Sequence, residues 1–106
     1  MTILVDDPIW PAHGRYWAHL VSDESLTELH DFAQALAIPP RGFDRDHYDI
    51  PDEYVTIAVE LGATKVGPKE LLIRLVASGL RVRKFQNLEL EISGSLEYIV
   101  AINDSV

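Results

Sequence analysis

Cysteine is absent from this 106-residue sequence, and its absence removes several kinds of chemistry at once. Without thiols there is no disulfide framework and no thiolate zinc site, so a metal would have to be held by histidine and carboxylate side chains. A cysteine nucleophile is excluded for the same reason. Glycine is also scarce, with six residues, and none are spaced as in a P-loop or a dinucleotide-binding loop.

Long apolar stretches and basic residues are scarce as well. No apolar run reaches the roughly 18 to 20 residues of a membrane-spanning helix, and residues 1–7 lack the features of a signal peptide, so we expect a cytoplasmic protein without membrane partners. Nine Lys and Arg stand against 17 Asp and Glu, which gives a net charge of -8. This charge makes nucleic acid an unlikely partner, whereas a phosphorylated small molecule needs only a few local cations.

The composition is otherwise that of a globular protein, with 47% hydrophobic and 25% charged residues. A chain of 106 residues has room for one hydrophobic core, so we expect a single domain over residues 1–106. All four histidines, at positions 13, 19, 30 and 47, lie in the first half of the chain, which is also the more acidic half. This concentration indicates that any chemistry is carried by residues 1–50.

Hydrophobic spacing predicts alternating strands and helices through most of the chain. Ser25 and Glu28 fit a capping box, and apolar residues then recur at helical spacing until Pro39. Between Pro8 and Asp23 there is no clean period, which predicts a long aromatic-rich connection. Strands are expected at residues 3–5 and 63–66, an extended piece at 41–48, and helices at 25–38, 51–61 and 68–78. This order favours an α/β fold of two or three layers, with three helices and a short, mostly parallel sheet.

A different pattern begins near residue 85. Leu88, Leu90 and Ile92 alternate with glutamates, a Ser-Gly-Ser turn follows, and residues 96–102 are apolar and β-branched. We therefore predict an antiparallel hairpin over residues 85–106, as an extension of the domain. Its strands would extend the sheet or pair with a second copy of the chain, because exposed strand edges allow either arrangement.

Several uncommon residue types occur in an order and at a spacing typical of one protein family. They are Ile3-Leu4-Val5-Asp6-Asp7-Pro8 with Trp10-Pro11, His13-Gly14-Arg15, His19-Leu20 and Ser22-Asp23, then Phe43, Arg45-Asp46-His47-Tyr48-Asp49 and Pro51. Over about residues 2–84 the chain resembles the small bacterial and phage family catalogued as domain of unknown function 4031. The resemblance implies no activity or cofactor. The chain departs from the family at Gly67, where a serine-like helix cap is expected, and in its acidic tail.

The first group of candidate site residues follows the first predicted strand. Asp6 and Asp7 end that strand, and His13, Arg15 and His19 lie in the connection after it. Carboxylates and imidazoles are the ligands that a cysteine-free chain offers to a divalent metal such as zinc, manganese or magnesium. The alternative is structural, because an aspartate at such a position often caps a turn and a histidine often makes a structural hydrogen bond.

The second group is the polar run from Arg45 to Asp49. Asp46 beside His47 can fix the tautomer of the ring and raise its basicity, and Arg45 can hold a phosphate or a carboxylate. The alternative is an exposed, salt-bridged loop that leads into the next helix.

Both groups are expected to lie near one edge of the sheet, where they could meet. His13, His19, His47 and Arg15 would then form a cationic pocket suited to an anion. Trp10 and Tyr48 could stack on a base or a sugar there, although aromatic residues of small domains more often belong to the core.

These residues together suggest a small-molecule enzyme, a hydrolase or transferase acting on a phosphorylated or nucleotide-like substrate. The predicted catalytic residues are His13, His19, His47 and Asp46; the predicted substrate-binding residues are Arg15, Arg45, Trp10 and Tyr48; and the predicted metal ligands are Asp6 and Asp7. The alternative function is that of a non-catalytic ligand-binding or assembly module that forms a homo-oligomer through the hairpin at residues 85–106.

Overall fold

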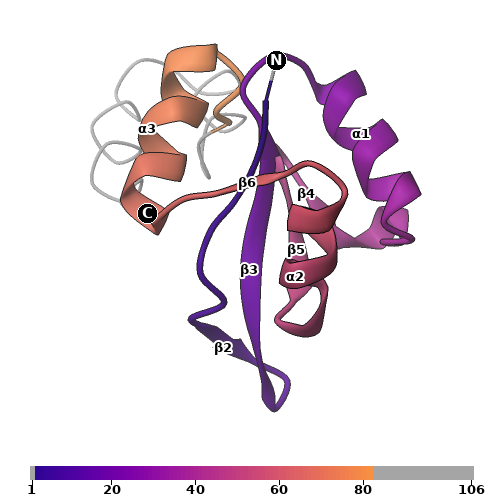
Figure 1. Cartoon of the computed structure of the whole chain (residues 1–106). Helices are drawn as coiled ribbons and strands as arrows, with labels where there is room; N and C mark the ends of the chain where they lie inside the picture. Colours follow the sequence, from indigo (N-terminus) through magenta and orange to yellow (C-terminus); the bar gives the residue numbers. More distant parts are fainter. Residues whose placement is uncertain (1, 83–106) are drawn as a thin grey trace, which may run out of the picture.

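The computed structural model describes residues 2–82, which form a sheet with helices on both faces (Figure 1). Helices α1 and α2 cover one face, and α3 covers the other, so the fold has three layers. The strands are β1 (Ile3–Val5), β2 (Trp10–Ala12), β3 (Arg15–Ser22), β4 (Phe43–Asp44), β5 (His47–Pro51) and β6 (Thr64–Lys65), and the helices are α1 (Leu26–Ala35), the 3-10 turn η1 (Pro40–Gly42), α2 (Glu53–Glu60) and α3 (Pro68–Ser78). The expected α/β class and the three helices are confirmed.

The sheet is mixed, and the prediction of a mostly parallel sheet is wrong. Its order is β4-β5-β3-β1-β6, with β2 also paired to β3, and β1 with β6 is the parallel pair while the other pairs are antiparallel. The difference arises between Pro8 and Asp23. An irregular connection was expected there, but the structure has a hairpin of β2 and β3. Its turn is formed by His13 and Gly14, whose φ angles of 51° and 77° are both positive, as in the type I′ turns that suit tight hairpins.

Local chemistry explains the start of α1 and the end of α3, whereas α2 begins later than expected. The Ser25 side chain accepts the backbone N–H of Glu28 at 3.1 Å, which confirms the predicted cap of α1. Pro51 closes β5 rather than opening α2, which begins at Glu53. Helix α3 ends at Gly79, whose φ of 85° places it in the left-handed conformation that glycine adopts without strain.

Alternation along the strands assigns their side chains to the two faces of the sheet. Val5 and Leu20 pack in the core under α1 and α2, whereas Leu4 and Val21 pack against Leu75 of α3. Because successive residues of a strand point to opposite faces, His19 in β3 lies on the α3 face together with Val21. The same alternation decides where the polar residues of β5 lie.

Two sequence-based predictions concern the rest of the chain. The hairpin expected over residues 85–106 lies outside the described residues. Within residues 2–82, no helix combines the length and the apolar character that crossing a membrane requires.

Candidate metal centre

Neighbouring strands place four polar residues next to one another on the α3 face of the sheet. His19 of β3 lies directly opposite Asp49 of β5 in the strand register, and His47 precedes Asp49 on the same face of β5. On the other side of β3, the backbone N–H of Asp6 donates to the carbonyl of His19 at 3.2 Å. The register of adjacent strands therefore assembles the site.

The pairing of β1 with β3 places Asp6 opposite His19, and a bulge follows Asp6. Val5 pairs with Leu20 and Trp10 pairs with Trp17, so residues 6–9 of one strand face only residues 18 and 19 of the other. Asp6 is completely buried, and its Oδ1 accepts the backbone N–H of His19 at 2.6 Å, in place of a strand carbonyl. Its Oδ2 lies 2.9 Å from His19 Nδ1 and also accepts the indole N–H of Trp10 at 3.4 Å.

A second buried aspartate holds His47 in the same way. Oδ1 of Asp46 lies 2.7 Å from His47 Nδ1, and Oδ2 accepts the backbone N–H of Val82 at 2.7 Å and lies 3.7 Å from Nη1 of Arg81. Burial would raise the pKa of Asp46, but the hydrogen bonds from His47 and from the Val82 N–H outweigh it and lower that pKa. For His47, burial would lower the pKa, yet its hydrogen bonds to Asp46 and Asp49 raise it to about 9.

The two rings converge on Asp49. Oδ1 of Asp49 lies 3.3 Å from Nε2 of His47 and 3.8 Å from Nε2 of His19. One ligand atom from each of these residues lies within 4.8 Å of the other two. Ligand atoms bound tetrahedrally at about 2.0–2.1 Å from a zinc ion are about 3.3 Å apart, so only small movements would let these three share one ion. We call His19, His47 and Asp49 the ligand cluster.

The Nδ1 atoms of both histidines are occupied by buried carboxylates. Metal-binding histidines characteristically have such a carboxylate behind them, because it fixes the tautomer that leaves Nε2 free and makes that atom a stronger ligand. Two imidazoles and one carboxylate suit Zn²⁺ or a non-haem Fe²⁺ ion. Binding would have to displace the proton that His47 carries at neutral pH in the metal-free protein.

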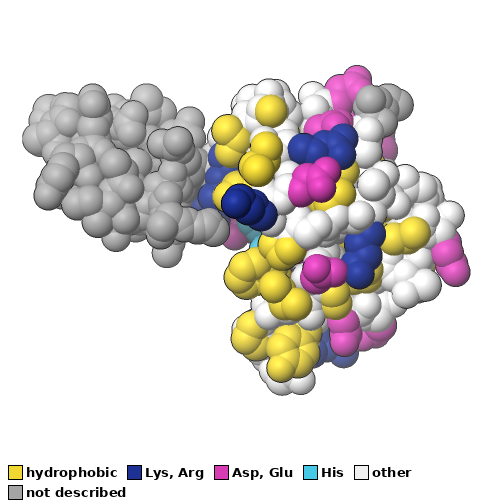
Figure 2. All heavy atoms as spheres, turned by 60° about the vertical axis from the view of Figure 1, so that its left-hand side comes forward, with side chains coloured by type: hydrophobic (Ala, Val, Ile, Leu, Met, Phe, Trp, Pro, Cys, Tyr) yellow, Lys and Arg dark blue, Asp and Glu magenta, His cyan; other side chains and the backbone are white. Residues whose placement is uncertain are grey.

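The ligand cluster lies in a cleft of about 610 Å³ between the sheet and α3. Leu72 and Leu75 of α3 form its apolar wall, and the basic side chains that line it are Arg45, Lys69 and Arg81. In Figure 2 a small histidine surface is visible between two apolar patches, beside a basic side chain. A metal ion held by the cluster could therefore be reached by a small molecule.

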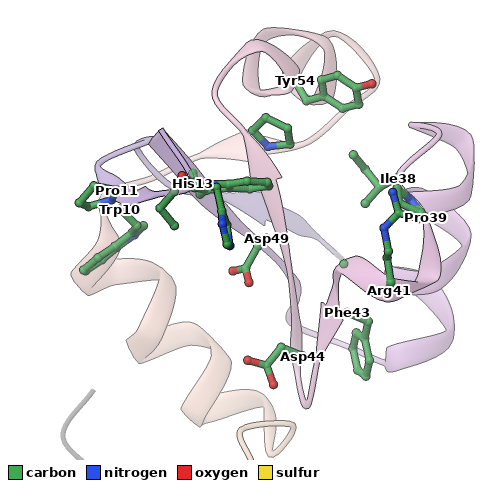
Figure 3. A pocket seen from close by; sticks show the side chains of 14 residues that line it. Trp10, Pro11, His13, Ile38, Pro39, Arg41, Phe43, Asp44, Asp49 and Tyr54 are labelled. Carbon is green, nitrogen blue, oxygen red and sulfur yellow. Dashed lines mark hydrogen bonds between the residues drawn. The ribbon is translucent and has the colours of Figure 1, made fainter. Parts of the chain in front are cut away.

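A second cavity of about 800 Å³, the aromatic cavity, adjoins this cleft, and Trp10, Asp44 and Asp49 line both. Figure 3 shows the carboxylates of Asp44 and Asp49 near the centre of this cavity, between Trp10 and His13 on one side and Phe43 on the other. Its other aromatic and proline walls are Pro11, Trp17, Pro39, Pro51 and Tyr54. Asp49 thus lies where a polar cleft and a largely apolar cavity meet.

The structure separates the two aspartates predicted as metal ligands. Asp6 lies behind His19 and holds its ring, whereas Asp7 forms an ion pair with Lys65 at 2.9 Å and is not brought to the ligand cluster. Asp49 was not predicted as a ligand. The signal for it was the spacing His47-x-Asp49, which places both side chains on one face of a strand.

The other predicted site residues are divided in the same way. His19, His47 and Asp46 come together, and Arg45 and Trp10 line the cleft beside them. His13 lies in the β2–β3 turn and lines the aromatic cavity but not the cleft. Arg15 pairs with Glu53 at 3.3 Å, and Tyr48 is buried on the opposite face of β5, where its hydroxyl lies 2.7 Å from Nδ1 of His30. The structure does not bring Arg15 or Tyr48 to the ligand cluster.

One family model matches the chain over residues 3–78, and its description is "Protein of unknown function (DUF4031)". The matched segment runs from β1 to α3 and includes the ligand cluster together with Asp6 and Asp46. No curated protein and no solved structure shows a significant match to the chain.

Proposed function

Because the chain belongs to the DUF4031 family, whose description assigns no activity, we propose from the site itself that it is a metal-dependent hydrolase. His19, His47 and Asp49 hold a divalent transition-metal ion. The observation that carries this proposal is the matched pair of histidines, each fixed at Nδ1 by a buried aspartate and each with Nε2 directed at the same carboxylate.

The number of ligands favours a catalytic ion over a structural one. Structural zinc sites usually have four protein ligands, whereas catalytic sites have three and keep a position for water. Within the described part of the chain, the cluster offers three ligand residues and opens into the cleft. The open position on the ion would therefore face the space in which a substrate binds.

Hydrolysis at a metal ion needs an attacking hydroxide and protein ligands that hold the ion in a fixed position. A divalent ion in such a site lowers the pKa of bound water to about 7, so hydroxide is available at neutral pH. The hydroxide oxygen bonds to the electrophilic atom of the substrate, the bond to the leaving group breaks, and the leaving group takes up a proton. Asp6 and Asp46 act on this step through the histidines, because they keep both rings in the orientation that the metal requires.

We expect the protein, purified without chelator, to contain about one equivalent of metal and to hydrolyse one or more of a set of nitrophenyl phosphate and carboxylate esters. A chelator should abolish turnover, and added Zn²⁺, Mn²⁺ or Fe²⁺ should restore it. Asp49→Ala should reduce the rate to that of the chelated protein, since it removes a ligand. The matched control is Asp7→Ala, which removes an exposed carboxylate that pairs with Lys65 and lines neither the cleft nor the aromatic cavity.

Two outcomes would contradict this proposal. Turnover that survives complete removal of metal would mean that the histidines and aspartates act as a metal-free acid and base. Stoichiometric metal without turnover of any ester would instead support the non-catalytic ligand-binding module.

A further inference from the structure

Basic side chains gather around the proposed metal centre, although the chain as a whole has a net charge of -8. Arg45, Lys69 and Arg81 all line the cleft, and they come from the β4–β5 turn, the first turn of α3 and the segment after α3. Three separate segments thus place positive charge in one cleft, where it balances the carboxylates of Asp6, Asp44 and Asp49. A divalent ion at the ligand cluster would make the charge of the cleft positive, which favours an anionic ligand.

Lys69 is the basic side chain best placed to hold that anion. Arg45 already contacts Asp44 at 3.0 Å, and Arg81 lies 3.7 Å from Asp46, whereas Lys69 forms no salt bridge within residues 2–82. Lys69 also belongs to the first turn of α3, where Gly67 gives no side-chain cap and backbone N–H groups carry partial positive charge. The lysine charge and the helix terminus therefore act in the same direction.

The aromatic cavity provides for the other end of the ligand. Trp10 lines both the cleft and this cavity, and its ring centroid is 5.2 Å from that of His19. A ligand could bind beside the metal centre through its anionic group. The rest of the ligand would then extend past Asp49 to the rings of Trp10 and Trp17. Figure 3 shows the ring of Trp10 in the wall of the cavity. Aromatic walls of this kind bind planar apolar groups.

We infer that the substrate is an organic phosphate with a planar ring, whose phosphate lies between the metal ion and Lys69 and whose ring lies against Trp10. This inference rests on the proposed metal centre. In the reaction the oxygen of water bonds to phosphorus, the ester P–O bond breaks, and the alcohol that carries the ring takes up a proton. The products are inorganic phosphate and that alcohol.

Calorimetric titration of the zinc-loaded full chain with three probes tests both halves of the site. Phenylphosphonate, whose C–P bond the proposed reaction does not break, should bind at least about tenfold more tightly than inorganic phosphate, and phenol should bind most weakly. Lys69→Met should weaken the binding of both anionic probes about tenfold and leave zinc affinity unchanged. The matched control is Lys65→Met, because Lys65 pairs with Asp7 and does not line the cleft.

The ring half is tested by Trp10→Ala, which should remove the advantage of phenylphosphonate over inorganic phosphate, and by Trp10→Phe, which should restore it. Since Trp10 and Trp17 are the two tryptophans of the chain and both line the aromatic cavity, their fluorescence should change with phenylphosphonate more than with inorganic phosphate.

Each failure has a distinct meaning. Zinc binding with unchanged phosphate affinity in Lys69→Met would overturn the anion site and leave the metal centre intact. Equal affinity for phenylphosphonate and inorganic phosphate would overturn the ring site. A chain that does not bind zinc would overturn the metal centre and this inference with it.

Discussion

Addition of Zn²⁺ to the metal-free protein should raise its melting temperature by about 10–20 °C. The ligands belong to β3 and β5, and only the folded sheet brings them within 4.8 Å of one another, so the ion binds the native state in preference to the unfolded chain. A ligand at a hundred times its Kd stabilises the native state by about 2.7 kcal/mol, and in a domain of this size each kcal/mol is worth about 4–8 °C. Thermal unfolding followed by circular dichroism, with and without zinc, measures the shift.

Ligand variants should lose this shift while keeping the fold. In His47→Ala the buried carboxylate of Asp46 still accepts the N–H of Val82 and still lies near Arg81, so the substitution does not leave that charge without partners. The control is His30→Gln, because His30 is an exposed histidine of α1 that contacts Tyr48 and not the ligand cluster. A full shift in His47→Ala would place the zinc ion elsewhere in the protein, and a lost shift in His30→Gln would indicate a nonspecific effect.

The sequence predicted the helices better than the sheet, and the burial of β3 explains why. Ser25 and Gly79 mark helix ends through their own local chemistry, which needs no tertiary context. Strand β3 lacks a period of two because both faces are exposed at its start, beyond the cover of the helices, whereas Leu20 to Ser22 are buried beneath helices on both sides of the sheet. At neither end of β3 is one face buried and the other exposed, so the alternation of apolar and polar residues that identifies a strand does not appear.

The site was only partly predicted, because its assembly also depends on long-range strand pairing. His19 and His47 were expected to come together, and they do, with ring centroids 5.0 Å apart. The expected cause was a shared edge of parallel strands, whereas the structure shows side-by-side antiparallel strands. Strand register depends on long-range pairing and on the bulge after Asp6, so no local pattern specified that Asp49 faces His19.

Replacement of Asp6 by asparagine should weaken zinc binding by about 10–100-fold, the range typical of residues that support metal-binding histidines. The ionised carboxylate of Asp6 has no proton to donate, and it accepts three hydrogen bonds, from the backbone N–H of His19, the indole of Trp10 and the ring of His19. An asparagine keeps one acceptor oxygen and adds an NH₂ group that would donate to Nδ1 of His19. The ring proton would then move to Nε2 and occupy the atom that binds the metal.

The same substitution should also destabilise the metal-free protein by about 0.5–1.5 kcal/mol, because the indole N–H of Trp10 would lose its acceptor while the remaining oxygen still accepts the His19 N–H. The control lies next to it in the sequence: Asp7→Asn affects an exposed ion pair with Lys65, which is worth at most about 1 kcal/mol, and should leave zinc affinity unchanged. Zinc affinity from competition with a chelating dye and stability from urea unfolding separate the two effects. Equal zinc affinities for the two variants would show that Asp6 supports the strand bulge alone, whereas a selective loss in Asp6→Asn would show that the buried carboxylate sets which nitrogen of His19 meets the metal.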